Sequence, residues 1–191
     1  MQQSPFIAIG GGLAGAAFAL ELARNGASVS VLESMRGPHH KVCGEFLSAE
    51  AQRLIAYLGL DLAALGASRI GRFRLATGGR HAEAPLPFCA AGFSRHRLDE
   101  ALLQAAEKAG AVVERGVTVS EVTPTEGSVA LRAGSRKFTA RAVALASGKH
   151  ALRQYPRPPS DMVGFKLQLR LTPRAHAALE NFVLIVMLNG G

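Results

Sequence analysis

Hydrophobic and polar positions at the start of the chain predict a strand, a helix and a second strand in succession. Phe6 to Ile9 is a short apolar run that ends in glycines, as a buried parallel strand does. Leu13 to Arg24 follows with apolar residues at helical spacing, and Asn25-Gly26 provides a helix stop signal. The valine-rich stretch from Ser28 to Leu32 indicates the second strand. The pattern therefore predicts a βαβ unit with a right-handed crossover.

The hydrophobic pattern of the next fifty or so residues is weaker. Ser48 is a suitable N-cap for a helix that continues to Leu58. From Asp61 to Phe93 the pattern indicates loops and short strands, such as Arg72 to Ala76. The prolines of Pro85-Leu86-Pro87 argue against a central strand at that point.

The second half of the chain predicts one more helix and a small antiparallel sheet. A helical stripe from Leu98 to Ala109 is closed by Gly110, and Ala111 to Glu114 indicates a short strand. The strands expected after it are Val117 to Val122, Ser128 to Arg132 and Lys137 to Thr139, as an antiparallel meander, and then Ala142 to Ala146, Gly164 to Leu171 and Phe182 to Leu188. These elements predict an α/β, Rossmann-like fold with a parallel sheet, flanking helices and a small antiparallel β-meander.

Charge and hydropathy narrow the classes of partner. The net charge is +8, and 17 of the 22 basic residues are arginine. This charge fits either an anionic partner or an arginine-rich surface. We favour the second interpretation and expect no nucleic acid partner, because the arginines are scattered singly. No apolar run approaches the roughly 20 residues that a membrane span needs, so no transmembrane segment is expected.

The cysteines and histidines give little sign of a metal or disulfide framework. Cys43 and Cys89 stand far apart without a CxxC spacing, which favours a reducing, cytoplasmic location. His39-His40 is not accompanied by carboxylates or cysteines at a recognisable ligand spacing. We therefore expect no metal site.

A glycine-rich turn between the first strand and helix is the clearest candidate for chemistry. Residues 10–15 read GGGLAG and fit the pattern G-x-G-x-x-G. Gly10 allows the tight turn, Gly12 lets a diphosphate approach the backbone, and Gly15 lets the helix pack on the sheet. The amides of Leu13 and Ala14 at the helix start would then face the phosphates. Alone the hexapeptide is a weak signal, because glycine-rich turns also serve as packing devices.

An acidic residue at the end of the second strand strengthens this prediction. Glu33 lies about twenty residues after the turn, where a carboxylate can accept hydrogen bonds from ribose hydroxyls. An acidic residue there disfavours a 2′-phosphate, so NADP is not expected at this site. The local residues do not decide between FAD and NAD, since both cofactors use the same turn.

Three further segments carry a resemblance to a known family. They are Lys41 to Ser48 (KVCGEFLS), Ser94 to Asp99 (SRHRLD) and Ala146 to Gly148 (ASG). In order with the glycine turn and Glu33, they resemble the FAD-dependent oxidoreductases of the p-hydroxybenzoate hydroxylase and geranylgeranyl reductase type. The similarity runs from Phe6 to about Arg170, and the first two segments are its more specific part.

The resemblance implies FAD as the cofactor and assigns roles to several positions. The motif glycines would hold the diphosphate, and Glu33 the adenosine ribose. The segment from Lys41 to Gly44 would run beside the flavin, and Arg95 would approach the cofactor from the start of its helix. The remaining implied contacts are the backbone near Val119 at the adenine edge and Ser147-Gly148 over the adenosine portion. For Arg95, a simple salt bridge to Asp99 or Glu100 is the alternative interpretation.

The resemblance also suggests a domain organisation. Residues 1–150 would form the FAD-binding domain, with an inserted segment at about 61–93, and residues 151–191 would begin a substrate-domain sheet. The Gly-Asp signature that such enzymes carry further downstream is not present. Because Asn189-Gly190-Gly191 directly follows a strand-like run, we expect the chain to be a fragment of a longer protein.

The functional hypothesis is an FAD-binding oxidoreductase, either a flavin-dependent monooxygenase or a geranylgeranyl-reductase-like enzyme. NAD(P)H is the candidate electron donor, and the substrate would be a small lipid-like or aromatic molecule. Two alternatives remain: a non-catalytic truncated nucleotide-binding fragment, and an NAD-dependent dehydrogenase, which the KVCGE segment disfavours. No catalytic residue can be named from this stretch.

Overall fold

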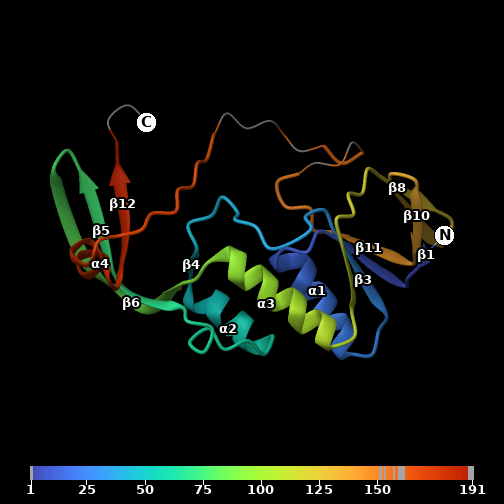
Figure 1. Cartoon of the computed structure of the whole chain (residues 1–191), viewed down its shortest axis with the longest axis horizontal. Helices are drawn as coiled ribbons and strands as arrows, with labels where there is room; N and C mark the ends of the chain where they lie inside the picture. Colours follow the sequence, from blue (N-terminus) through green and yellow to red (C-terminus); the bar gives the residue numbers. More distant parts are fainter. Residues whose placement is uncertain (1, 151, 153, 157, 159–161, 189–191) are drawn as a thin grey trace. The chain divides into compact units, whose positions relative to one another are not determined.

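The chain divides into two compact units in the computed structural model, which describes residues 2–150, 152, 154–156, 158 and 162–188. The first unit comprises Met1–His40 and Arg95–Val163, and the second comprises Lys41–Ser94 and Gly164–Gly191. Figure 1 labels the elements of both units. The expected chain end at residues 189–191 lies outside the described residues, as does residue 151, at which the expected second domain begins.

A four-stranded parallel sheet forms the centre of the first unit. Its strand order is β11-β2-β3-β7, and every neighbouring pair is parallel. The strands are β2 (Phe6–Ile9), β3 (Val29–Glu33), β7 (Val112–Arg115) and β11 (Ala142–Leu145). The predicted βαβ unit is confirmed, because β2 pairs with β3 and α1 (Leu13–Arg24) connects them.

Two helices pack against one another beside this sheet. They are α1 and α3 (Arg95–Lys108). The buried face of α1 consists of small residues and Leu20, whereas α3 contributes Leu98, Leu102 and Leu103. The alanines of α1 let its backbone lie close to the sheet, and the leucines of α3 fill the remaining space.

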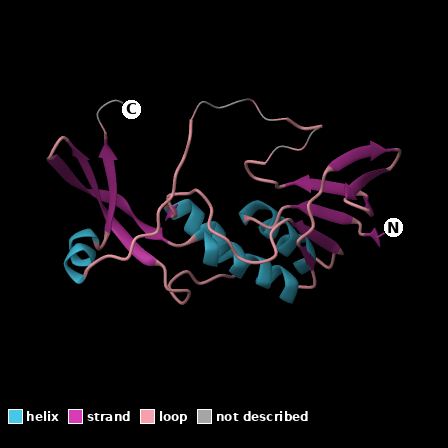
Figure 2. Ribbon diagram, turned by 45° about the horizontal axis from the view of Figure 1, so that its top comes forward, coloured by secondary structure: helices cyan, strands magenta, loops and turns pink. Residues whose placement is uncertain are grey.

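The opposite face of the parallel sheet is covered by the predicted meander (Figures 1 and 2). Its strands are β8 (Glu121–Thr125), β9 (Ser128–Ala133) and β10 (Arg136–Ala140), joined at their edge by β1 (Gln2–Gln3). Ile7 and Ile9 of β2 belong to the same buried cluster as Leu131 and Phe138 of the meander. Successive side chains of β2 therefore point alternately to the two faces of the parallel sheet, as the two-residue period of a strand requires.

The first meander strand begins later than the sequence pattern predicts. Val117 and Val119 are buried but precede β8, which starts at Glu121. The apolar spacing there reflects burial of the connecting segment in the core and not ladder pairing. The turns between the meander strands lie at Gly127 and Gly134, which have φ of 71° and 59°.

The second unit is a mixed sheet with the strand order β12-β5-β6-β4. Its elements are β4 (Phe46–Leu47), α2 (Ala49–Tyr57), β5 (Ser68–Thr77), β6 (Arg80–Gly92), α4 (Pro173–Leu179) and β12 (Phe182–Met187). The predicted cap of α2 is confirmed: the Ser48 hydroxyl accepts a 3.2 Å hydrogen bond from the amide of Ala51.

The prediction of loops and short strands between residues 61 and 93 is wrong. This segment contains a long antiparallel hairpin of β5 and β6. The prolines are tolerated because β4 pairs only with Ala91 and Gly92, so the rest of that side of β6 is an edge. The pairing with β5 is also irregular beside Pro85 and Pro87, since it shifts register between Ile70 and Arg72.

The prediction of a strand from Gly164 to Leu171 is also wrong. These residues form no strand ladder with any described part of the chain, and Phe165, Leu167 and Leu169 are exposed. Alternation alone cannot create a strand, because the backbone groups need a neighbouring strand as partner. The helix α4 that follows was not predicted, although Thr172 caps it and Pro173 occupies its first turn.

Candidate functional site

The turn between β2 and α1 is shaped by close approaches that only glycine allows. Gly10 has φ of 100°, and a Cβ there would lie 2.5 Å from the carbonyl oxygen of Ala146. A Cβ on Gly15 would lie 1.9 Å from the carbonyl oxygen of Gly10. The glycines at these two positions are therefore required by packing of the loop itself, whatever it binds.

Gly12 differs, because the space around it is open. A Cβ on Gly12 would have only ordinary contacts, at 3.7 Å, with Arg95 and Asp99. Gly12 is the N-cap of α1, its backbone is extended, and its carbonyl accepts the first helical bond from Ala16 at 2.9 Å. No side chain of the described residues caps this end of the helix. The first-turn amides of Leu13 and Ala14 therefore have no helical carbonyl as partner and can receive an anion.

Glu33 is held against this turn. It is the last residue of β3 and is 6% exposed. Its Oε2 accepts a 2.6 Å hydrogen bond from the amide of Gly11. Its Oε1 accepts hydrogen bonds from the amide of Met35 at 2.8 Å and from the hydroxyl of Ser34 at 3.2 Å. The carboxylate therefore points to the glycine turn, and the backbone on both sides of it fixes its orientation.

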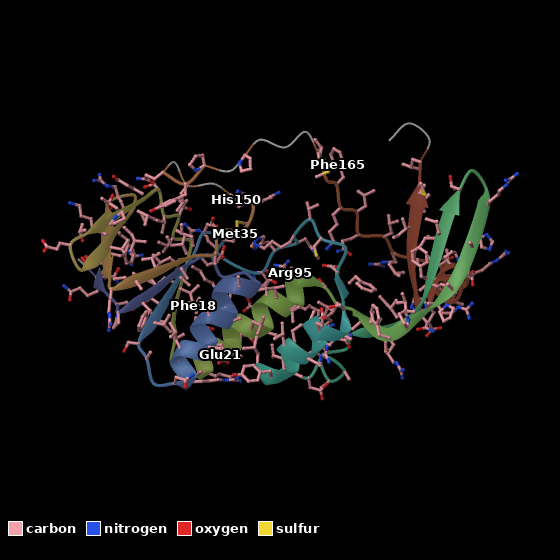
Figure 3. All side chains as sticks on the ribbon, turned by 180° about the vertical axis from the view of Figure 1, so that it is seen from behind. Phe18, Glu21, Met35, Arg95, His150 and Phe165 are labelled. Atoms are coloured by element: carbon pink, nitrogen blue, oxygen red, sulfur yellow. The ribbon has the colours of Figure 1, made fainter. Side chains whose placement is uncertain are left out.

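Arg95 lies on the other side of the same turn. It is the first residue of α3, and Figure 3 shows it at that end of the helix. Its Nε and Nη2 donate to the two carboxylate oxygens of Asp99, at 2.6 and 3.0 Å. Nη2 also lies 3.7 Å from the position that a Cβ on Gly12 would occupy. The expected approach to the cofactor and the salt bridge to Asp99 are thus compatible roles for Arg95, because the salt bridge orients the guanidinium beside the turn.

The segment after β11 completes the wall of the turn. The Cα of Ser147 would lie 3.3 Å from a Cβ on Gly10, so this segment touches the loop directly. Its own conformation is fixed by a tight turn, in which the Ser147 hydroxyl donates to the carbonyl of His150 at 2.7 Å. Gly148 has φ of 63°, a value that favours glycine.

Val119 lies in the hydrophobic core of the first unit. It is 6% exposed and shares its buried cluster with Ile9 and Leu32. The chain reaches this position directly from the site, since the amide of Val117 donates to the carbonyl of Glu33 at 2.9 Å. The side chain of Val119 serves packing, so any ligand contact at this position would involve the backbone.

Lys41 and Gly44 belong to the second unit. Lys41 is partly exposed and Gly44 is exposed. A Cβ on Gly44 would meet no atom within 4 Å, so no local packing requires glycine there. The first unit alone therefore brings together the glycine turn, Glu33, Arg95 and Ser147, and the roles of Lys41 and Gly44 stay predictions.

Two residues of the site were missed by sequence reasoning as site residues. Gly11 donates the hydrogen bond to Glu33, and a Cβ on it would lie 3.0 Å from Leu103. The motif treats this position as free, so no sequence signal indicated it. Asp99 orients Arg95, and its i,i+4 spacing was the available signal.

These residues fit a diphosphate-linked nucleoside. The turn offers helix amides, a guanidinium and an open approach at Gly12, and Glu33 offers a carboxylate for hydroxyl groups. No group of three or more His, Cys, Asp or Glu residues suited to a metal ion occurs in the described part of the chain. Among the described helices, none is both long and apolar enough to cross a membrane.

Comparison with known families agrees with this geometry. The profile of the FAD binding domain family matches residues 4–150. Among curated proteins, none matches the chain.

Solved structures resemble the chain in fold. A halogenase in complex with phloroglucinol and FAD has a TM-score of 0.64 and 22% identity, and the match covers 75% of this chain and 34% of that one. A flavoprotein/dehydrogenase from Cytophaga hutchinsonii has a TM-score of 0.67 and 22% identity, and the match covers 77% of this chain and 40% of that one. The p-nitrophenol 4-monooxygenase from Pseudomonas putida DLL-E4 has a TM-score of 0.67 and 18% identity, and the match covers 76% of this chain and 41% of that one. The predicted α/β, Rossmann-like class is confirmed, and the chain spans less than half the length of these proteins.

Proposed function

Because the chain belongs to the family of FAD binding domains, we propose that it forms the cofactor-binding part of a flavin-dependent oxidoreductase of the monooxygenase type. The cofactor of this family is FAD. The structures that resemble the chain include two proteins whose names state monooxygenase activity. These matches support the reaction class, and the residues of the site support the mode of binding.

One observation carries the proposal: the buried carboxylate of Glu33 is bonded to the amide of Gly11 inside the glycine turn. A carboxylate at this place binds the hydroxyls of an adenosine ribose while the neighbouring helix start binds the diphosphate. The hydrogen bond from Gly11 ties the end of β3 to the glycine turn, so the carboxylate and the helix start are held in fixed positions relative to one another. Such preorganisation lowers the cost of binding.

Each site residue then has a defined task. The amides of Leu13 and Ala14 would bind the diphosphate, with Gly12 leaving room and Arg95 neutralising its charge. FAD, when bound, supplies the redox chemistry, and the protein supplies orientation and exclusion of water. Glu33 would hold the adenosine ribose in place.

The remaining predicted positions would complete the contacts. The backbone at Val119 would meet the adenine edge, and Ser147-Gly148 would cover the adenosine portion. Lys41 and Gly44, in the second unit, would run beside the flavin ring. The expected organisation assigns the start of the substrate domain to residues 151–191, and the part of this range from Gly164 onward belongs to the second unit.

The substrate proposed is a small aromatic molecule. Phloroglucinol and p-nitrophenol, which are named for two structures that resemble the chain, are both phenols. The electron donor proposed is NAD(P)H, and activity with a lipid-like alkene instead would favour the reductase alternative. The two free cysteines, Cys43 and Cys89, are exposed, which favours a reducing compartment such as the cytoplasm.

The test is titration of the purified chain with FAD, in which quenching of flavin fluorescence and changes in the flavin absorbance bands report binding. FMN and NAD serve as comparison ligands. We expect FAD to bind much more tightly than FMN, because FMN lacks the adenosine that Glu33 would hold. Tighter binding of NAD than of FAD would support the dehydrogenase alternative and contradict the proposal.

A further inference from the structure

A largely buried ion pair joins two segments of the second unit that are far apart in the sequence. Nζ of Lys166 lies 2.5 Å from Oε1 of Glu45, and the two side chains are only 15% and 18% exposed. Within the described part of the chain, Glu45 is the only carboxylate within ion-pair distance of Lys166. Loss of either residue would therefore leave a shielded charge without its counter-charge.

The contact between the two side chains is one of charge. The ammonium of Lys166 is shielded from solvent, but it donates no well-aligned hydrogen bond to the described residues. The attraction between opposite charges depends on their separation and not on this alignment. The short distance to Glu45 therefore determines where the ammonium lies.

Glu45 is held in a strained backbone conformation. Its φ is 57°, in the left-handed region that a residue with a long side chain rarely adopts. Its carbonyl accepts a 2.9 Å hydrogen bond from the amide of Phe93, one residue beyond the pairing of Phe46 with Gly92. Its amide donates to Sγ of Cys43 at 3.4 Å. The backbone and the carboxylate of Glu45 thus have separate partners, and strain of this kind persists only where the surroundings hold the residue in place.

A second contact joins the same two segments. A Cβ on Gly164 would lie 3.1 Å from Cγ1 of Val42, so the backbone at Gly164 approaches this side chain closely. Gly164 precedes Lys166 by two residues, and Val42 precedes Glu45 by three. Residues 164–166 therefore lie along residues 42–45, although they form no strand ladder with any described residue.

We propose that Glu45, held by Lys166, is a positioning residue that keeps the segment Lys41–Gly44 in the conformation that receives the flavin. This inference rests on the proposed function, in which the segment would run beside the flavin ring. Glu45 directly follows the segment, and its amide is bonded to Cys43 within it. Without the ion pair, the segment would have to be ordered when FAD binds, and the cost of this ordering weakens the affinity.

The experiment compares FAD with ADP, which shares the adenosine and the diphosphate but has no flavin, by calorimetry on the whole chain. Glu45→Gln and Lys166→Met should each weaken FAD binding about tenfold and leave ADP binding unchanged. The exchange of charges in the double variant Glu45→Lys, Lys166→Glu should recover part of the FAD affinity. Arg170→Gln is the matched control and should change neither affinity, because Arg170 lies four residues after Lys166, is exposed and forms no ion pair with the described residues.

A second measurement needs no ligand. Hydrogen exchange of the Phe93 amide, followed by NMR, should be about tenfold faster in Glu45→Gln and Lys166→Met than in the wild type, because the acceptor of this amide is the carbonyl of Glu45.

Four results would each overturn the inference: unchanged FAD affinity in both single variants, equal losses of FAD and ADP affinity, an equal effect of Arg170→Gln, or unchanged exchange of the Phe93 amide. A wild type that binds neither FAD nor ADP would contradict the proposed function itself and, with it, this inference.

Discussion

The Oε2 atom of Glu33 accepts a 2.6 Å hydrogen bond from the amide of Gly11, so the end of one parallel strand is tied to the turn that leaves its neighbour. The hydrogen bond spans 22 positions in sequence and is buried. It joins the two parts of the proposed nucleotide site, the glycine turn and the acidic residue.

Glu33→Gln should weaken FAD binding by about ten- to a hundredfold, because a charge-assisted hydrogen bond to the ribose contributes about 1.5–3 kcal/mol. The Gln side chain keeps one oxygen for the amide of Gly11, but its NH2 group replaces the oxygen that accepts from the amide of Met35, so some loss of stability is also expected. Fluorescence titration with FAD measures the first effect and denaturant unfolding the second. FAD affinity equal to that of the wild type would remove Glu33 from the binding site.

Gly12→Val should abolish FAD uptake while the far-UV circular dichroism stays close to that of the wild type. A Cβ at Gly12 meets atoms only at 3.7 Å, so the fold has room for a side chain where the diphosphate would approach. Gly15→Ala is the contrasting variant. Its Cβ would lie 1.9 Å from the carbonyl oxygen of Gly10, so it should lower the free energy of unfolding by about 1–3 kcal/mol. If Gly12→Val still takes up FAD, the turn does not bind the diphosphate.

Arg95→Gln should weaken FAD binding about tenfold, since it removes a cation beside the diphosphate. Asp99→Asn should have a smaller effect, because it leaves the guanidinium in place but removes its orienting carboxylate. The FAD affinities of the wild type, the two single variants and the double variant form a double-mutant cycle, which measures the coupling between Arg95 and Asp99. Strict additivity of the two changes would show that Asp99 does not act through Arg95.

Glu83 should make the stability of the second unit dependent on pH. The hydrogen bond from Arg74 holds the pKa of this carboxyl below its ordinary value, with smaller contributions from Arg72. A carboxylate with a lowered pKa in the folded state stabilises the fold above its ordinary titration range, and this contribution is lost as the pH falls. Glu83→Gln should therefore lower the unfolding midpoint at about pH 7 and have little effect near pH 3.

The control for this experiment is Glu126→Gln. Glu126 lies in a turn of the meander and forms no ion pair within the described residues, so this variant should leave the pH dependence unchanged. A midpoint difference for Glu83→Gln that persists at low pH would show that packing, and not charge, explains its effect.

The hairpin of β5 and β6 shows where sequence reasoning fails. Pro85 and Pro87 argued against a central strand, because a proline cannot donate to a ladder, and the segment was therefore expected to form loops and short strands. Whether that donor is needed depends on the neighbouring strand, and β4 reaches only Ala91 and Gly92. The sequence of β6 does not contain this information. The same reason explains the opposite error at residues 164–171, where alternation was present but a partner strand was not.

The sequence by itself determined the βαβ unit, the positions of the motif glycines and the acidic residue after the second strand. These features depend on local periodicity, backbone freedom and spacing along one short segment, which a sequence records directly. Only the tertiary structure decided that Gly11 bonds to Glu33, that Asp99 orients Arg95 beside Gly12, and that Lys166 pairs with Glu45. Apart from the salt bridge between Arg95 and Asp99, which are four residues apart, these features depend on contacts between residues that are far apart in the chain. Packing of the whole core determines their distances.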